Sequence, residues 1–341
     1  MRYVKDRLSL QPKQGISDSS EFHIAFTGTA NYIPWIGVAM VSILQHNMWG
    51  GERCHFHILA DTIEKKDLAA LQEVADTWGI PIDIYYMNDE YLSQFARFHR
   101  YFIGGRYLPA LLYRFMIPDI ISENIQRILY LDGDIVCNGN VVPLICDDMR
   151  GNTVTAVSDI QEGKFAKRLS LTKYFNSGVL LIDAQRWREQ NLTESFLQYM
   201  KKEADEHPEL PCPDQDILNI VLHEQTLFAD QCYNLQYRLV QPSLFKERIH
   251  NGDAMQASLI HFIGAIKPWT TYNQCVPIVK VWAAAKAASP WKDVPLHQPT
   301  SQKAIHQAAR DARRRGCWGE MLSWYIRFIK SKFDGTPTVG Y

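Results

Sequence analysis

The first third of the chain alternates between two hydrophobic patterns. Short apolar runs predict strands at 21–27, 54–59 and 81–86. Between these runs apolar residues recur every three or four positions, which predicts helices from Ile33 to Leu44 and from Leu68 to Trp78. Strands that alternate with helices are typical of α/β proteins, so we expect a mixed but mainly parallel sheet that is flanked by helices.

The pattern changes character near residue 275. Before that point, apolar runs predict strands at 127–131, 153–158, 178–182 and 258–262. Helices are predicted at 193–206 and 214–223, with helical structure also near Tyr113 and Arg114. Beyond Pro277 only helices are predicted, at 279–288, 302–315 and 318–332. We therefore divide the chain into an N-terminal extension (1–20), a main α/β domain (21–275) and a helical C-terminal region (276–341).

The composition narrows the class of protein. Of the 341 residues 46% are hydrophobic and 21% are charged, which excludes disordered and fibrous proteins. The net charge of −1 gives no indication of a nucleic-acid partner. The seven cysteines are odd in number and none forms a CxxC pair, so we expect a reducing compartment, without a disulfide framework or a thiolate zinc site. No secretory signal and no transmembrane helix is expected, because the N-terminus is polar and no run of 18 apolar residues occurs.

The charge is concentrated near the C-terminus. Residues 303–332 carry eight basic and two acidic side chains, a net charge of about +6, which leaves about −7 for the rest of a chain whose total is −1. Within the same segment, apolar residues share one helical face: Trp318, Met321, Leu322, Tyr325, Phe328 and Ile329. Aromatic side chains flanked by cations are typical of helices that lie on an anionic membrane surface. The alternative is that this stripe packs on the main domain and leaves its cations in water.

Two carboxylates follow the predicted strand at 127–131. Asp132 and Asp134 stand on either side of Gly133. Ligands of open α/β sheets collect at the carboxyl ends of the strands, and two hard oxygen donors suit Mg²⁺ or Mn²⁺. The pattern therefore predicts a divalent metal site that serves a phosphate-bearing ligand. The alternative is a polar turn that only closes the strand.

A second candidate segment surrounds the late strand. His261 could supply a nitrogen ligand, Gly264 would allow a phosphate to approach the backbone, and Lys267 could offset phosphate charge. Taken singly, a histidine at the end of an apolar strand is usually structural and a lysine is usually a surface charge. The spacing of the two around a glycine leaves both interpretations open.

Five segments together resemble a known family. They are, in chain order, HIAFTGTANY, LYLDGDIV, YFNSGVLLID, PDQDILN and HFIGAIKPW. In this order they resemble glycosyltransferase family 8, and within it the bacterial lipopolysaccharide glucosyl- and galactosyltransferases. The resemblance covers residues 22 to about 270, and SPWKD at 289–293 is similar to the C-terminal region of the same subgroup.

The resemblance implies a fold and an activity. The fold would be a single-sheet nucleotide-sugar fold of the GT-A type. The enzyme would use Mn²⁺ or Mg²⁺ and transfer glucose or galactose from a UDP-hexose, with retention of configuration, to the outer core of lipopolysaccharide. Its lipid-linked acceptor would be presented on the cytoplasmic face of the inner membrane, and the apolar stripe and basic residues of the C-terminal helices predict that these helices hold the enzyme there.

The resemblance also assigns roles to residues at the metal and the nucleotide. The metal ligands would be Asp132, Asp134 and His261. The uridine pocket would be formed by Thr27, Gly28, Thr29, Asn31 and Tyr32, and Tyr32 would stack on uracil. Gly264 and Lys267 would hold the diphosphate.

Further roles concern the transferred sugar. Arg114 would approach the donor sugar and the phosphates. The sugar site would be lined by Asp159, Asn176, Ser177 and Gly178. Asp214 and Gln215 would face the reacting carbon and the sugar hydroxyls.

Each of these sugar-site groups also has a structural interpretation. The Asn176–Gly178 segment could be a turn into a strand, Asp214 and Gln215 could belong to a helix cap with acids in its first turn, and Arg114 could pair with an unseen carboxylate. Whether Asp214 or Gln215 is a nucleophile, or whether transfer proceeds directly on one face, stays open.

Thr29 departs from the family pattern. Many relatives carry an acidic residue at this position, whereas threonine can form a hydrogen bond but has no charge. This difference concerns donor affinity or nucleotide preference more than the class of enzyme. Two alternatives to a transferase follow: a nonenzymatic nucleotide- or saccharide-binding protein with a degraded donor site, and a sugar-nucleotide hydrolase.

Overall fold

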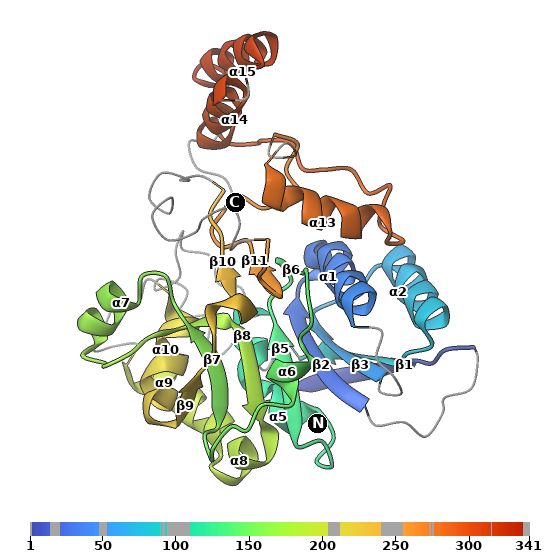
Figure 1. The fold of residues 1–341 in the computed structure, drawn as a ribbon, viewed down its shortest axis with the longest axis vertical. Coiled ribbons are helices and arrows are strands. Elements are labelled where there is room, and N and C mark those ends of the chain that lie inside the picture. Colours follow the sequence, from blue (N-terminus) through green and yellow to red (C-terminus); the bar gives the residue numbers. More distant parts are fainter. Residues whose placement is uncertain are drawn as a thin grey trace.

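An eight-stranded sheet forms the centre of the molecule (Figure 1). The computed structural model describes residues 2–13, 21–47, 53–88, 90, 93, 110–203, 212–239, 255–272, 274, 276–314 and 316–336. The strands follow the order β1-β4-β3-β2-β5-β8-β7-β9. Their bounds are Val4–Leu10 (β1), Glu21–Gly28 (β2), Arg53–Ala60 (β3), Ile82–Met87 (β4), Arg127–Leu131 (β5), Val154–Ser158 (β7), Phe175–Asp183 (β8) and Thr226–Phe228 (β9).

The sheet is mixed and mainly parallel, as the alternating pattern predicts. Strands β4, β3, β2 and β5 are parallel to one another, and β9 is parallel to β7. Strand β8 runs antiparallel between β5 and β7, and β1 runs antiparallel to β4 at the edge. Strand β1 belongs to the segment that the sequence analysis set apart as an extension, and its exposed, charged middle explains why hydrophobicity did not reveal it.

A second, three-stranded sheet has the order β10-β11-β6. It consists of Leu235–Gln236 (β10), Leu259–His261 (β11) and Ile135–Cys137 (β6). Strand β6 begins four residues after β5 ends, and it is too short to stand out in the sequence. Its antiparallel pairing with β11 brings two chain segments together that are more than a hundred residues apart.

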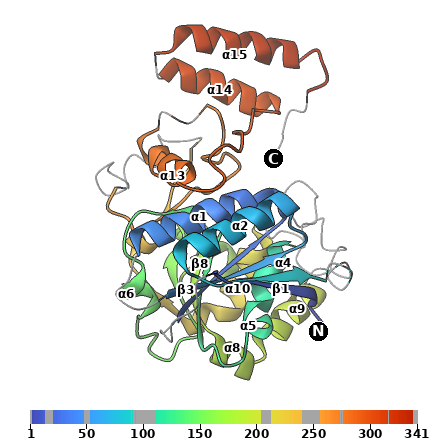
Figure 2. The ribbon, with the colours of Figure 1, turned by 90° about the vertical axis from the view of Figure 1, so that its right-hand side faces the viewer.

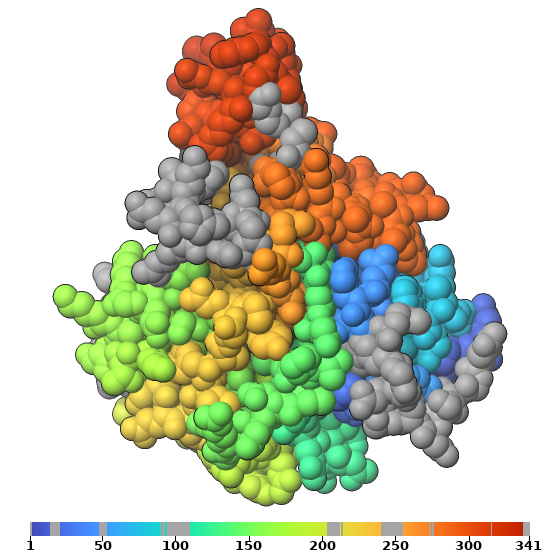
Figure 3. Space-filling model, viewed as in Figure 1, coloured from blue at the N-terminus to red at the C-terminus, as the bar shows by residue number. Residues whose placement is uncertain are grey.

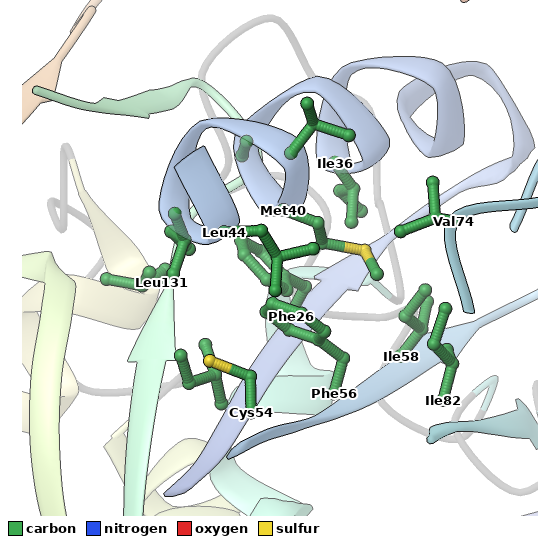
Figure 4. Close-up of a cluster of buried hydrophobic side chains, with 14 of the residues drawn as sticks. Phe26, Ile36, Met40, Leu44, Cys54, Phe56, Ile58, Val74, Ile82 and Leu131 are labelled. Atoms are coloured by element: carbon green, nitrogen blue, oxygen red, sulfur yellow. The ribbon is translucent and has the colours of Figure 1, made fainter. Parts of the chain in front are cut away.

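Helices cover both faces of the large sheet (Figures 1 and 2). One face packs against α1 (Ile33–His46) and α2 (Lys65–Trp78). The core between them is apolar, and Figure 4 shows Met40 and Leu44 of α1 over Phe26, Phe56 and other strand residues. The other face packs against α4 (Ala110–Tyr113), α5 (Ile117–Ile120), α8 (Ala184–Glu189), α9 (Leu192–Glu203) and α10 (Pro213–Leu222). Two further helices are α6 (Val142–Ile145) and α7 (Glu162–Leu169).

The first part of the C-terminal region packs on the body. Helix α13 (Pro277–Ala287) contributes Trp282 to a cluster in which the rings of Trp35 and Trp269 stack at 5.0 Å. Beyond α13, Trp291 lies directly on Gly37 of α1, where an added Cβ would stand 2.1 Å from a ring carbon. The Trp291 indole also donates a 2.8 Å hydrogen bond to Asp67 of α2, so this stretch is held by shape and by a polar contact.

The last two helices form a hairpin that projects from the body (Figures 2 and 3). They are α14 (Gln302–Arg314) and α15 (Trp318–Ser331), and they pack against each other. In the described part of the chain no helix is long and apolar enough to cross a membrane. The division of the chain near residue 275 stays a prediction, since the region beyond it contains both a stretch packed on the body and this hairpin.

Candidate active site

Asp132 follows directly after the carboxyl end of β5. The backbone N–H of Asp132 donates to the Gly178 carbonyl of neighbouring β8 at 2.8 Å, which fixes the turn. The side chain accepts a 2.5 Å hydrogen bond from Tyr130 on Oδ1, and the same oxygen lies 3.2 Å from Arg114 Nη2. Tyr130 and Arg114 thus fix the orientation of the Asp132 side chain, and Arg114 balances its charge.

The pairing of β6 with β11 brings His261 to the carboxylates. His261 is the register partner of Ile135, the residue that follows Asp134. Its Nε2 lies 3.1 Å from Asp134 Oδ1 and 3.7 Å from Asp132 Oδ2. Its Nδ1 lies 3.1 Å from the Asn234 Oδ1, to which it donates, so Nε2 turns its lone pair toward the carboxylates.

These three side chains fit a divalent cation. Their ligand atoms lie within 4.8 Å of one another. The Oδ1 atom of Asp134 is buried and accepts no hydrogen bond from the described residues. A buried anionic oxygen without a donor is costly unless a cation satisfies it. Two carboxylates and one oriented imidazole are a donor set that Mn²⁺ or Mg²⁺ accepts.

Gly178 makes room for this arrangement. A Cβ at this position would stand 2.3 Å from His261 Cε1 and 2.9 Å from Asp132 Oδ2. The Asn176–Gly178 segment is not a turn before a strand: it lies inside β8, which begins at Phe175 rather than at the predicted residue 178. Gly133 is equally confined, since its Cβ would stand 2.8 Å from Ile36.

Lys267 is paired within the site. Its ammonium group binds Asp134 and donates to the Phe262 carbonyl at 2.9 Å. Burial alone would lower the pKa of Lys267, but Asp134 outweighs it and raises the pKa above the usual value. Burial would likewise raise the pKa of Asp134, yet the charge of Lys267 holds that pKa below its usual range. Both groups are therefore charged at neutral pH.

Gly264 lies between His261 and Lys267 in a backbone conformation with φ +88°. This left-handed region favours glycine, since a side chain there is strained. A Cβ would meet no atom of the described residues within 4 Å, so the space beside Gly264 is open.

Arg114 links Asp132 to the residues that are predicted to line the sugar site. It lies in the 3₁₀ turn Arg114–Met116 and is buried over the Tyr130 ring. Besides Asp132, it lies 3.3 Å from Asp214 and donates to Ser177 Oγ at 2.9 Å. Burial alone would lower its pKa, but Asp132 and the other nearby acids raise it above the usual value. The carboxylates that pair with Arg114 are both predicted site residues.

Asp214 stands at the start of α10. The Asp214 carboxyl has a raised pKa because it is buried, although Arg114 opposes the shift. Asp216, two residues on, faces away from Arg114 and is bound by Arg168 at 2.6 Å and by Tyr174 at 2.5 Å.

Gln215 is the centre of a buried amide network. Its Oε1 accepts from the Ser177 backbone N–H at 3.0 Å and from the Asn176 amide at 3.1 Å. Its Nε2 donates to Asp159 Oδ2 at 3.2 Å and to Tyr174 at 3.2 Å. A register shift between Ala156 and Val157 of β7 accompanies this cluster, as is common where a strand is bent to aim side chains.

The residues that are predicted to form the uridine pocket lie at and just beyond the end of β2. Thr27 Oγ1 lies 3.2 Å from the Tyr130 hydroxyl, and Gly28 touches Ile36, where a Cβ would stand at 2.9 Å. Thr29 makes no side-chain capping bond to the following 3₁₀ turn, Ala30–Tyr32. The Asn31 and Tyr32 side chains are exposed, and the Tyr32 ring meets Trp269 edge-on at 5.7 Å.

Three contributors to the site went unnoticed in the sequence. Asn234 orients His261 and links it to Asn176 through a 2.9 Å bond. Tyr130 was part of the quoted motif but had no role assigned. Asp61, at the end of β3, accepts from the Ala30 N–H at 3.0 Å beside Thr29. Asn234 and Asp61 stand in irregular segments, where no periodicity marks them.

A cavity of about 370 Å³ opens beside the amide network. Its lining is mainly polar and includes Asp159, Gln161, Lys164, Asn234 and Gln236. Asp159 and Asn234 thus face both the cavity and the cluster around Gln215.

Comparison with known proteins agrees with this geometry. Residues 23–273 match the model of glycosyl transferase family 8, and residues 277–332 match the model of its C-terminal region. The chain belongs to glycosyl transferase family 8. It is therefore a glycosyltransferase, and the expected family is confirmed.

Individual relatives span nearly the whole chain. A lipopolysaccharide glucosyltransferase (WaaO) of Escherichia coli K12 is 29% identical over 91% of this chain and 90% of its own length. A lipopolysaccharide 1,3-galactosyltransferase of Salmonella typhimurium is 28% identical over 93% of both chains. Among solved structures, the galactosyltransferase LgtC is 20% identical with a TM-score of 0.62, over 79% of this chain and 96% of its own. This likeness confirms the GT-A fold.

Proposed function

We propose that the protein transfers glucose or galactose from a UDP-hexose, with retention of anomeric configuration, to a hydroxyl of the lipopolysaccharide outer core. The observation that carries the proposal is the cluster of Asp132, Asp134 and His261 beside a buried sugar-site network. Relatives that match this chain over nine-tenths of their length are named as lipopolysaccharide glucosyl- and galactosyltransferases.

A divalent cation, Mn²⁺ or Mg²⁺, would be held by Asp132, Asp134 and His261. When bound, it supplies positive charge to the departing diphosphate. Lys267 and the open backbone at Gly264 belong to the segment that follows His261 and would bind the phosphate oxygens. Because Lys267 already neutralises one oxygen of Asp134, its ammonium would turn from that carboxylate toward the diphosphate when the donor arrives.

The uridine would lie between Tyr32 and the end of β2. Tyr32 is exposed and its ring meets that of Trp269 in a T-shaped arrangement, and we propose that its exposed part stacks on the base. Thr29 would contact the nucleotide as a neutral group. Asp61 supplies a carboxylate beside Thr29, although that oxygen is already engaged with the backbone.

The transferred hexose would be held by the network around Gln215. Asp159, Asn176, Ser177 and Gln215 restrain one another, so they form a preorganised wall for sugar hydroxyls. The amide oxygen of Gln215 is engaged by donors from two residues. Asp214, paired with Arg114, is the other group that would face the reacting carbon, and either transfer route stays open.

The acceptor would enter through the cavity beside Asp159 and Asn234. Its polar lining suits a saccharide, whose hydroxyls require many hydrogen-bond partners. An acceptor hydroxyl bound there would stand next to the sugar-site network.

Two other functions rest on weaker grounds. A nonenzymatic binding protein has Thr29 as its only support, and the intact metal-ligand cluster argues against it. A sugar-nucleotide hydrolase would share the donor site but would need no acceptor, so a hydrolysis rate that acceptors do not stimulate would favour it.

The decisive experiment incubates the protein and Mn²⁺ with a panel of UDP-sugars and truncated lipopolysaccharides. We expect one UDP-hexose to be consumed only when a suitable acceptor is present, and mass spectrometry of the product should show one added hexose. Consumption without an added hexose would replace the transferase proposal with hydrolysis.

We further propose that the α14–α15 hairpin holds the enzyme on the cytoplasmic face of the bacterial inner membrane. The apolar stripe of α15 is divided between two environments. Tyr325 and Phe328 contact His306 of α14, whereas Trp318, Leu322 and Ile329 are exposed. Arginines 310, 313 and 314 line a groove on the same hairpin, so apolar and cationic groups are presented together.

Truncation after Pro299 tests this proposal. The shortened protein should stay folded and active on short acceptors but should no longer sediment with phosphatidylglycerol vesicles. Aggregation of the truncated protein would indicate a helix docked on the body instead. If the full-length protein stays in the supernatant at low salt, the membrane proposal is wrong.

A further inference from the structure

A second group of candidate metal ligands lies away from the active site. His23 on β2 and His55 and His57 on β3 each offer a ring nitrogen, and these atoms lie within 4.8 Å of one another. The strand register explains the grouping. His23 is the register partner of His55, and His57 follows two residues later on the same strand face. We call these three residues the histidine cluster.

The histidine cluster occupies its own face and end of the sheet. Figure 4 shows Cys54, Phe56 and Ile58, which alternate with the histidines, packed in the core beneath α1 and α2. The histidines therefore point to the opposite face. His23 and Thr27 are four residues apart on β2, which corresponds to about 13 Å at about 3.3 Å per residue, so the cluster is separate from the nucleotide pocket.

The ring nitrogens of His23 and His57 face each other. His23 Nδ1 and His57 Nε2 are 3.1 Å apart, a spacing close to that of two nitrogens bound to one tetrahedral cation. The other nitrogen of His57 lies 3.2 Å from the Tyr85 hydroxyl, which orients the ring as the outer partners of metal-binding histidines do. Burial lowers the pKa of both imidazoles, that of His23 to about 4, so both are neutral at pH 7.

His55 completes the cluster, and its two ring nitrogens contact two acids. The His55 and His57 rings lie 4.4 Å apart. His55 binds Glu21 through Nδ1 and Asp83 through Nε2, both at 2.9 Å. Asp83 Oδ2 also lies 4.0 Å from His57 Nδ1, so this carboxylate borders two of the histidines. The cluster is partly open to solvent, because Glu21 and Asp83 are each about one-quarter exposed.

We propose that the histidine cluster binds one Zn²⁺ ion through its three imidazoles, with water completing the coordination. Three imidazoles are a donor set that zinc prefers, whereas Mn²⁺ and Mg²⁺ prefer oxygen. The ion would replace the proton between His23 Nδ1 and His57 Nε2, and one ring nitrogen of His55 would leave its carboxylate partner to bind the ion. It would tie β2 and β3 together at their amino ends, as a site independent of the donor-binding end.

Zinc titration of the full-length protein tests the proposal. The protein is first stripped with EDTA and then supplied with excess Mg²⁺ to occupy the carboxylate site. Calorimetry should show one Zn²⁺ bound per chain, and Co²⁺ at the same site should give the intense visible absorption of tetrahedral coordination. Zn²⁺ should also raise the melting temperature of the wild type.

Three variants separate this site from other metal sites. His55→Gln should weaken Zn²⁺ binding at least about 100-fold, since losing an outer partner alone costs about 10- to 100-fold. His223→Gln, at an exposed histidine in the turn His223–Gln225, should bind Zn²⁺ as the wild type does. Asp134→Asn should also retain the tetrahedral Co²⁺ spectrum, because it alters only the active site.

Two results would overturn the proposal. One is a wild type that binds no Zn²⁺ under excess Mg²⁺, which would leave the cluster as a hydrogen-bonded network. The other is Zn²⁺ binding that Asp134→Asn abolishes and His55→Gln leaves unchanged. The Co²⁺ spectrum of the wild type decides the question even if a histidine variant fails to fold.

Discussion

Helices α1 and α15 are both 14 residues long and both carry many apolar side chains, yet they meet opposite surroundings. In α1 every residue from Ile33 to Leu44 is buried between the sheet and α13. In α15 only Ser331 is buried, while Trp318 is 63% and Leu322 is 58% exposed. Of these two helices, only α1 has its apolar side chains covered by the body of the protein. The apolar side chains of α15 that α14 does not contact are exposed to solvent.

Charged side chains also differ between the body and the α14–α15 hairpin. In the body, Asp134 and Arg114 are buried and paired, and the half-buried Lys267 is paired with Asp134, so each is held in a defined position. On the hairpin, Lys330 is exposed, and Lys332 reaches across the Phe328 ring at 4.9 Å. Fixed charges suit chemistry on one substrate, whereas mobile surface charges suit attraction to an extended anionic surface.

A matched pair of substitutions should show the largest difference between the two helices. Met40→Asp places a carboxylate in the core of α1 and should lower the free energy of unfolding by more than about 4 kcal/mol. Leu322→Asp on α15 should change it by no more than about 0.5 kcal/mol, because the side chain already faces water. Urea denaturation measures both, and vesicle sedimentation should show weaker binding for Leu322→Asp. Equal destabilisation would mean that α15 is covered after all.

Asp134→Asn should lower turnover without changing vesicle binding. Loss of one anionic ligand should lower turnover at least about 100-fold, which is typical of a key electrostatic group. Vesicle binding should not change, because the hairpin is untouched. Asp148→Asn, at an exposed carboxylate, is the matched control and should keep full activity. Full activity of Asp134→Asn, or of the chelated wild type, would contradict the metal assignment.

Asn234→Ala should reveal how far the site depends on positioning. Without Asn234, the His261 Nδ1–H loses its acceptor and the ring is free to turn. The Mn²⁺ concentration for half-maximal activity should rise about 10- to 100-fold, the usual effect of removing an outer partner of a metal ligand. At saturating Mn²⁺ the turnover should recover. A lowered turnover with an unchanged Mn²⁺ requirement would show that Asn234 acts on the sugar instead.

Lys267→Ala should weaken UDP binding by about 1–3 kcal/mol, the range for a hydrogen bond to a charged group. Calorimetry of UDP binding in the presence of Mn²⁺ measures this change. Lys280→Ala, at an exposed position of α13, is the control for loss of a cation and should bind UDP normally. Equal UDP affinities of the wild type and Lys267→Ala would refute the diphosphate assignment.

The smallest effect is expected at Thr29. Thr29→Asp introduces the acid that the family resemblance leads us to expect at this position and should tighten UDP binding by about 0.5–1.5 kcal/mol through one added hydrogen bond. Thr29→Asn has nearly the same shape as Thr29→Asp but no charge, so it should tighten UDP binding less. Weaker binding of Thr29→Asp would indicate that Asp61 already occupies this role and repels a second carboxylate.

Most of the main elements could be predicted from the sequence, because the hydrophobic period of a long helix or strand is visible within the segment itself. The predicted helices at 302–315 and 318–332 match α14 and α15 to within one residue. Strands β6, β9 and β10 were missed because they have only two or three residues and exist through pairing with distant segments. Strand β1 was missed because its middle is polar and exposed.

The candidate site was predictable where a motif contains several polar residues, and less so elsewhere. Asp132, Asp134 and His261 converge as expected, although only strand pairing brings the histidine to the acids. Asn234 has no neighbouring pattern, so its bond to His261 could not be foreseen. The stripe of α15 was recognised, but a periodic pattern does not state what covers it, and part of this stripe packs on α14.

The contact of Trp291 with Gly37 has a consequence for how the family's C-terminal region can be exchanged. The Trp291 indole fills the space that a side chain at position 37 of α1 would need. Residues up to about 293 therefore pack on the body and should be kept with it when the C-terminal region is exchanged. The exchangeable unit is then the hairpin beyond Pro299. A graft of another relative's hairpin at that point should alter where the enzyme is held in the cell and leave its choice of sugar intact.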